Sequence, residues 1–206
     1  MQFARSSPPP RCEAGRIIVA MSAPAFVYVA VARYEDILKL GFSHDPCDRV
    51  RAFHERYFEY FDLERGLCLE TTDEKDARRI ELLLARRLAD YRACAPLVID
   101  TAAGGFTEWY RGAYPELIGA IAQLVREEGY APPQSLAARF RQRLLQEREL
   151  LFERSLAMVD AIEALAGEPQ AERLRTRLRA LLDAYAALQI DVEEFLAPDV
   201  RDWLSR

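Results

Sequence analysis

The chain has few of the residues that build a zinc site or a disulfide framework. It contains two histidines, and its four cysteines, Cys12, Cys47, Cys68 and Cys94, are widely spaced without a CxxC pair. This spacing argues against a zinc site. The sequence also shows no secretory signal and no apolar run of transmembrane length. We therefore expect a cytoplasmic protein with reduced thiols and no membrane partner.

Basic residues are fewer than acidic residues in this chain, and nearly all of them are arginine. The only lysines are Lys39 and Lys75, the net charge is −5 and the sequence pI is about 5.3. An acidic balance argues against a protein that coats nucleic acid by charge alone, although it leaves room for a nuclease with a local basic cleft. Because lysine is so rare in this chain, Lys39 is less easily explained as an accidental surface residue.

The 206 residues suffice for one ordinary domain and an appendage. Residues 1–23, which include a Ser-Pro-rich stretch, are expected to be disordered or a misassigned extension, with translation beginning at Met21. Residues 24–129 read as a compact α+β domain. The Pro-containing segment 131–134 marks a boundary, and residues 134–206 read as a helical hairpin that forms a coiled-coil-like tail.

The pattern of the first half predicts a β-hairpin followed by a helix. Apolar runs at residues 26–31 and 37–42 flank a short polar turn. Asp45 is a suitable N-cap and Pro46 a suitable first residue for a helix over residues 46–57.

A third strand is predicted over residues 64–70. Thr71 and Glu74 have the spacing of a capping box, so a long helix should run from there to about residue 91. After a Gly104-Gly105 turn, the sequence predicts a short strand at 106–110 and a helix at 115–128. The domain should therefore contain an antiparallel sheet of three or four strands flanked by helices.

Apolar periodicity in the tail predicts two long helices. The first should span residues 135–166 and end at Gly167, and the second should carry an apolar seam of heptad spacing from Leu174 to Val192. We expect the two to pair antiparallel, because neither can bury its apolar stripe alone. Leftover apolar positions such as Phe152 and Leu156 would then dock on the core or on a second copy, which would give a homodimer.

Four short motifs occur in an order known from one nuclease family. They are Tyr28 in the first strand, Lys39-Leu40-Gly41-Phe42-Ser43 in the second with Arg49 eight residues after Gly41, Glu81 in an Arg-rich helix, and Glu108-Trp109-Tyr110. This arrangement resembles the GIY-YIG nuclease superfamily, in particular the phage and bacterial branch with a K-[IL]-G-x-[ST] second motif and a closing E-W-[FY]. The resemblance covers about residues 24–127.

The resemblance implies a DNA endonuclease that depends on Mg²⁺ or Mn²⁺. Tyr28 would accept the proton of the attacking water, its acidity increased by neighbouring positive charge. Lys39 would hold the scissile phosphate or lower the pKa of Tyr28, and Arg49 would neutralise charge that develops on the phosphate. Glu81 would be the only protein ligand of one weakly bound metal ion, whose other ligands are water and phosphate oxygens.

Other residues are assigned supporting roles. Ser43, Arg51 and His54 would contact the substrate. Glu108 would support the site or brace the fold, with structural roles for Gly41 and Trp109.

Each of these residues also has an ordinary structural interpretation. Tyr28 could be a packing residue of a strand, Lys39 could face solvent, and Arg49 could pair with an aspartate of its own helix. Glu81 could be one more solvated carboxylate on an Arg-rich helix.

The chain also departs from the family pattern. It contains no Asn, where the archetype has a late one, and Phe53 stands where many members have Tyr. The alternative hypothesis is a catalytically inactive domain of the same fold that binds nucleic acid, or a protein partner, through its helical tail.

Overall fold

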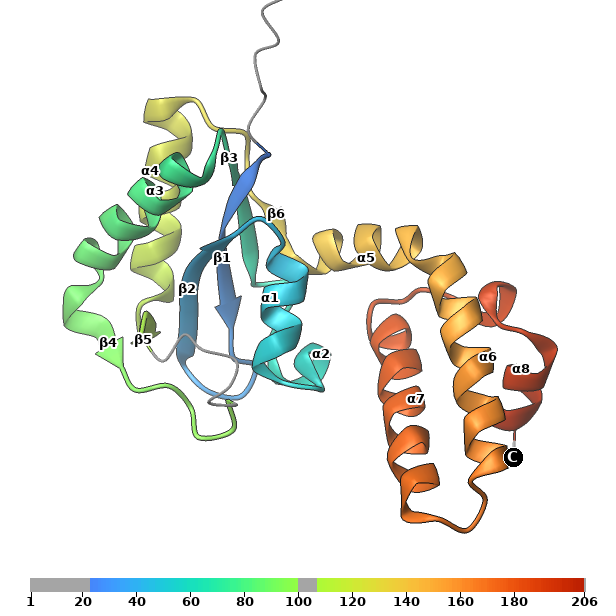
Figure 1. Ribbon diagram of the computed structural model, residues 1–206. Helices are drawn as coiled ribbons and strands as arrows, with labels where there is room; N and C mark the ends of the chain where they lie inside the picture. Colours follow the sequence, from blue (N-terminus) through green and yellow to red (C-terminus); the bar gives the residue numbers. More distant parts are fainter. Residues whose placement is uncertain (1–22, 100–106, 206) are drawn as a thin grey trace, which may run out of the picture.

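The computed structural model describes residues 23–99 and 107–205 and has an α+β architecture (Figure 1). Six strands form one antiparallel sheet in the order β4-β5-β2-β1-β3-β6. The strands are β1 (Ala25–Val31), β2 (Ile37–Ser43), β3 (Leu67–Thr71), β4 (Arg92–Ala93), β5 (Trp109–Arg111) and β6 (Gln134–Ser135).

The predicted hairpin is present as β1 and β2, but the sheet is wider than the three or four strands predicted. The additional strands β4 and β6 have two residues each, too few to show an alternating pattern. β3 begins at Leu67 and not at residue 64. The predictions for residues 1–22 and for the turn at 104–105 lie outside the described residues.

Helices cover both faces of the sheet (Figure 1). The α-helices are α1 (Pro46–Phe53), α2 (Tyr57–Tyr60), α3 (Glu74–Arg87), α4 (Tyr114–Glu128), α5 (Leu136–Gln146), α6 (Arg148–Ala164), α7 (Pro169–Ala187) and α8 (Pro198–Leu204), and the short 3₁₀ helices are η1 (Ala89–Tyr91) and η3 (Glu193–Phe195). None of these helices in the described part of the chain has the length and apolar character needed to cross a membrane.

Alternation along β1 divides the interior into two apolar clusters. Val27 and Val29 pack with α3 and α4, whereas Tyr28 and Ala30 pack on the opposite face with α1 and the helices that follow β6. Every residue of β1 is buried because both faces of this central strand are covered.

Two predicted helix boundaries are corrected by the hydrogen bonds at their ends. Asp45 caps α1 as predicted, accepting from the Asp48 N–H at 3.1 Å, but the helix ends at Phe53 and the chain turns into α2. The capping box at Thr71 is wrong. Asp73 caps α3 by accepting from the Asp76 N–H at 2.9 Å, and the Thr71 hydroxyl donates to the Ala25 carbonyl.

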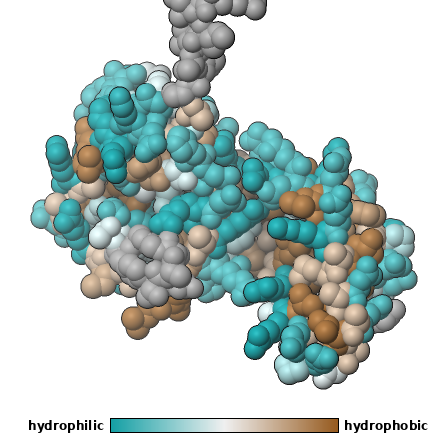
Figure 2. Space-filling model, in the orientation of Figure 1, coloured by the Kyte–Doolittle hydropathy of each residue, from teal (hydrophilic) through white to brown (hydrophobic). Residues whose placement is uncertain are grey.

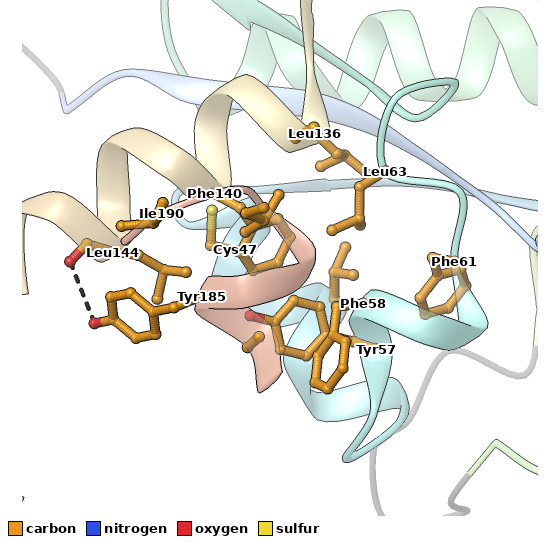
Figure 3. Packing of buried hydrophobic residues seen from close by; sticks show 14 of the residues in the cluster. Cys47, Tyr57, Phe58, Phe61, Leu63, Leu136, Phe140, Leu144, Tyr185 and Ile190 are labelled. Carbon is orange, nitrogen blue, oxygen red and sulfur yellow. Dashed lines mark hydrogen bonds between the residues drawn. The ribbon is translucent and has the colours of Figure 1, made fainter. Parts of the chain in front are cut away.

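The single long helix predicted over residues 135–166 is also wrong, because it breaks at Glu147 into α5 and α6, which run in different directions (Figure 1). α7 packs alongside α6 after a turn that contains Gly167 at φ +91°. β6 pairs with β3, and α5 packs on α1. The apolar cluster beneath α1 therefore continues without interruption through α5 to α7, as Figure 3 shows for Phe140, Leu144 and Tyr185.

Candidate functional site at the edge of β2

The candidate site lies where β5 stops covering the edge of β2. β5 pairs with β2 from Ile37 to Lys39, and the Leu40 N–H still donates to the Glu108 carbonyl at 3.1 Å. Beyond this point, no strand among the described residues pairs with that edge of β2. Side chains from β1, α1 and α3 come together at this position, which makes it a natural place for a ligand to approach the sheet.

Tyr28 and Gly41 face each other across β1 and β2. The Tyr28 ring is only 1% exposed and lies directly over Gly41, where an added Cβ would come within 2.5 Å of the tyrosine hydroxyl. Glycine at position 41 is thus required by the close approach of this ring. Tyr28 of the first motif and Gly41 of the second motif therefore pack directly against each other.

Arg49 is the cation beside the Tyr28 hydroxyl, although it does not make that hydroxyl acidic. Burial raises the pKa of Tyr28 to about 12, and the charge and hydrogen bonding of Arg49 oppose that shift only in part. The expectation that neighbouring positive charge gives Tyr28 an increased acidity is therefore not met, because desolvation of the phenolate outweighs it. The Arg49 guanidinium also lies 4.8 Å from the centre of the Phe53 ring.

Lys39 is buried and fully engaged by neighbouring oxygens. Its ammonium donates to the Thr107 carbonyl at 2.8 Å, to the Leu40 carbonyl at 3.0 Å and to a Glu108 carboxylate oxygen at 3.0 Å. These contacts use all three of its N–H donors. Burial nevertheless lowers the pKa of Lys39, with Glu108 acting in the opposite direction. The solvated position considered for Lys39 is excluded, and binding a phosphate would require it to release one of these partners.

Glu108 is held in an uncommon backbone conformation at the same place. Its φ is +61°, in the left-handed region that few non-glycine residues occupy. The contacts of Lys39 to the side chain of Glu108 and to the carbonyl before it support this conformation. Strained backbone of this kind is often found at functional sites.

Glu81 reaches the site from α3, which packs on the opposite face of the sheet from α1. Burial raises the pKa of Glu81, with a further contribution from Glu108, whereas Lys39, Arg78 and the Phe42 backbone amide lower it. A carboxylate whose proton affinity is raised by a second carboxylate nearby is a suitable environment for a cation. Within the described residues, no group of three or more His, Cys, Asp or Glu side chains could hold a metal ion.

A cleft of about 430 Å³ opens beside these carboxylates. Glu81 and Glu108 line it together with Arg92 and Tyr110. Trp109 contributes to its wall but is itself fully buried, in edge contact with Phe53, so it serves the core. The cleft gives a ligand of moderate size access to both carboxylates.

The structure brings only some of the predicted site residues together. Arg49 and Glu81 each act electrostatically on both Tyr28 and Lys39, so these four residues lie near one another.

The three predicted substrate-binding residues have other partners. The Ser43 hydroxyl exchanges hydrogen bonds with the Asp45 backbone, and Arg51 pairs at 3.4 Å with Glu147, the residue between α5 and α6. His54 accepts from the Arg56 N–H and stacks on Tyr60.

Two arginines that belong to this neighbourhood were not predicted. Arg78 lies three residues before Glu81 on α3, a spacing that places both on one helix face and could have identified it. Arg92 follows η1, in a segment whose sequence gives no periodic signal. Burial raises the pKa of Tyr110, and Arg92 opposes that shift. Arg92 also contributes, after Thr107 and Lys39, to the lowered pKa of Glu108.

Comparison with known proteins yields no relative: the chain matches no family model, no curated protein and no solved structure. Function is therefore inferred from the residues and geometry of the β2 edge.

Proposed function

We propose that the chain is a divalent-metal-dependent DNA endonuclease of the GIY-YIG type, with a nuclease-like domain followed by a helical tail. The observation that carries this proposal is the clustering of Tyr28, Lys39, Arg49 and Glu81 around the point where β5 stops covering the edge of β2. These residues come from four different elements, and the convergence of titratable side chains from separate elements on one place is typical of a functional site.

A Mg²⁺ or Mn²⁺ ion fits the donors that line the cleft. Glu81 is half-buried with a raised pKa, and Glu108 lies close enough to contribute to that shift. An ion of this kind uses few protein carboxylates and completes its coordination with water and phosphate oxygens. When bound, it would supply Lewis-acid stabilisation of the phosphate and help to form a nucleophile from water.

Arg49, Tyr28 and Lys39 have separate roles in the proposed reaction. Arg49 offers a planar set of N–H donors for the nonbridging oxygens of the phosphate. Tyr28 is the proposed acceptor of the water's proton. Because its pKa is about 12, it must first lose its own proton, and Arg49 is the cation that favours the ionised form. Lys39 keeps Glu108 in position beside Glu81.

The test is cleavage of supercoiled plasmid, branched DNA and single strands with Mg²⁺, Mn²⁺ or EDTA. We expect Glu81→Gln to reduce cleavage by about 100-fold or more, because it removes the charged metal ligand. DNA binding should be unchanged or tighter, since a negative charge near phosphate is lost. Glu70→Gln is the matched control, because Glu70 is exposed on β3. Cleavage in EDTA, or equal cleavage by Glu81→Gln and wild type, would reject the proposal.

A second function is favoured by the state of Lys39 and Tyr28. A lysine whose three donors are used internally and a tyrosine that is 1% exposed are both suited to a structural role. The alternative proposal is therefore a catalytically inactive domain that binds nucleic acid or a protein partner. Binding of branched DNA without cleavage under any metal condition would favour this alternative.

A further inference from the structure

A second cleft, of about 310 Å³, lies between α1 and α2 on one side and α6 and α7 on the other. It lies in the indentation between the two lobes of the molecule that Figure 2 shows. None of the residues assigned to the β2 edge lines it. Arg49 approaches Tyr28, whereas Arg51, half a turn further along α1, faces this second cleft. The two sites therefore lie on different sides of the same helix.

Three arginines from three helices meet in this cleft: Arg51 of α1, Arg154 of α6 and Arg177 of α7. Arg51 has an acidic partner in Glu147, which is also bound by Arg143 at 2.6 Å. Arg154 and Arg177 make no ion pair or hydrogen bond with any residue in the ranges 23–99 and 107–205. Their charges are thus available to an anion from solution.

The acidic side chains of Glu55 and Glu147 also line the cleft, and most of the remaining lining is apolar. Leu144 and Leu181 line it together with small residues of α7, among them Ala184. A pocket with apolar walls and a few converging charged groups is the common form of a small-molecule site, and the volume is at the lower end of the usual range. The lining therefore suits a ligand with one strongly anionic end and one flat apolar part.

We propose that this cleft binds a small organic phosphate whose phosphate contacts Arg154, Arg177 and Arg51 and whose apolar ring packs on Leu144 and Leu181. A phosphate matches three guanidinium groups better than a carboxylate does, because it offers three acceptor oxygens. A small ligand matches better than nucleic acid, since a phosphate backbone would leave the apolar walls without a contact. A ligand that contacts α1, α6 and α7 together stabilises their packing.

The experiment is calorimetric titration of the full chain with phenyl phosphate, inorganic phosphate and benzoate at low salt. We expect phenyl phosphate to bind at least about 10-fold more tightly than either of the other two, because it alone combines both features of the lining. The double variant R154Q/R177Q should weaken phenyl phosphate binding by about 10-fold or more. R173Q/R201Q, with one change on α7 and one on α8 and both outside the cleft, removes the same two charges and should bind like wild type.

Three outcomes would overturn the proposal. The first is absence of phenyl phosphate binding at roughly 10 mM ligand, and the second is unchanged binding in R154Q/R177Q. The third is loss of duplex DNA binding in R154Q/R177Q without any binding of phenyl phosphate, which would identify the arginines as nucleic-acid contacts. Glu81→Gln should retain phenyl phosphate binding, so this inference stands or falls separately from the proposed nuclease activity.

Discussion

At the scale of single residues, the candidate site depends on the packing of the Tyr28 ring against Gly41, which has no side chain. Tyr28 occupies the space above position 41, and its ring leaves no room for a Cβ there. The hydroxyl is buried beside Arg49, so the same packing fixes its position and raises its pKa.

Gly41→Ala is expected to destabilise the protein by about 1–3 kcal/mol, because the new Cβ would force the buried Tyr28 ring or the strand to move. Denaturation with urea measures the change. Gly119→Ala is the matched control, since Gly119 lies in α4 with nothing within 4 Å of an added Cβ. That variant should be more stable by about 0.5–1 kcal/mol from helix propensity. Equal effects of the two substitutions would show that the contact with Tyr28 is unimportant.

The raised pKa of Tyr28 predicts a loss of stability in alkali. The unfolded tyrosine ionises near pH 10 and the folded one near pH 12, so the folded state holds more protons between these values. Stability should therefore be intact below pH 10 and fall as pH rises, by about 2–3 kcal/mol from this residue by pH 12.

Unfolding of Tyr28→Phe and wild type should be compared between pH 9 and pH 11.5. The wild type should lose more stability than the variant over this interval. Tyr34→Phe is the control, because Tyr34 is 85% exposed and sees water in both states. A constant difference between Tyr28→Phe and wild type would contradict the assignment.

At the scale of elements, α5 joins the sheet domain to the last three helices. Phe140 is fully buried and stacks on Tyr57 of α2 with ring centres 4.6 Å apart. The Arg51 guanidinium lies near both rings, at 5.9 Å from Tyr57 and 5.6 Å from Phe140. α5 is therefore as much a part of the core as α1.

Phe140→Ala should cost about 3–5 kcal/mol in the free energy of unfolding, because it leaves a large cavity between α1, α2 and α5. Phe152→Ala makes the same chemical change on α6, where the side chain is 43% exposed. It should cost less than about 1 kcal/mol. Similar losses in the two variants would mean that α5 is not packed on the sheet domain as described.

At the scale of the whole molecule, one apolar cluster extends from the sheet to the C-terminal helices. It includes Tyr28 and Trp109 at one end and Leu178 and Val200 at the other. Surface ion pairs such as Arg56 with Asp183, at 3.0 Å, also connect the two parts. The predicted boundary at residues 131–134 does not coincide with a break in packing.

A continuous cluster predicts a single cooperative unfolding transition. The two tryptophans report on different parts, because Trp109 lies in β5 and Trp203 in α8. In Trp203→Phe, the fluorescence of Trp109 should follow the same denaturation curve as the far-UV circular dichroism of the helices. The same agreement should hold for Trp203 fluorescence in Trp109→Phe. Separate midpoints within either variant would indicate two independently folding units.

The sequence determined the elements that rest on local signals. Apolar alternation defined β1 and β2, Asp45 with Pro46 defined the start of α1, and Gly129 at φ +76° ends α4 where predicted. The expectation that Tyr28, Arg49 and Glu81 share one site came from the resemblance of the motifs to a nuclease family and not from such local signals.

The tertiary structure decided what depends on contacts between distant residues. The break at Glu147 follows from packing of α5 against α1 and from the pairing of Glu147 with Arg51, neither of which helix periodicity reveals. Sequence patterns also do not reveal that Lys39 binds Glu108, 69 residues away. Nor do they reveal that burial raises the pKa of Tyr28. Burial and electrostatic environment are properties of assembled neighbours, so the chemistry of these groups could be read only once the chain was folded.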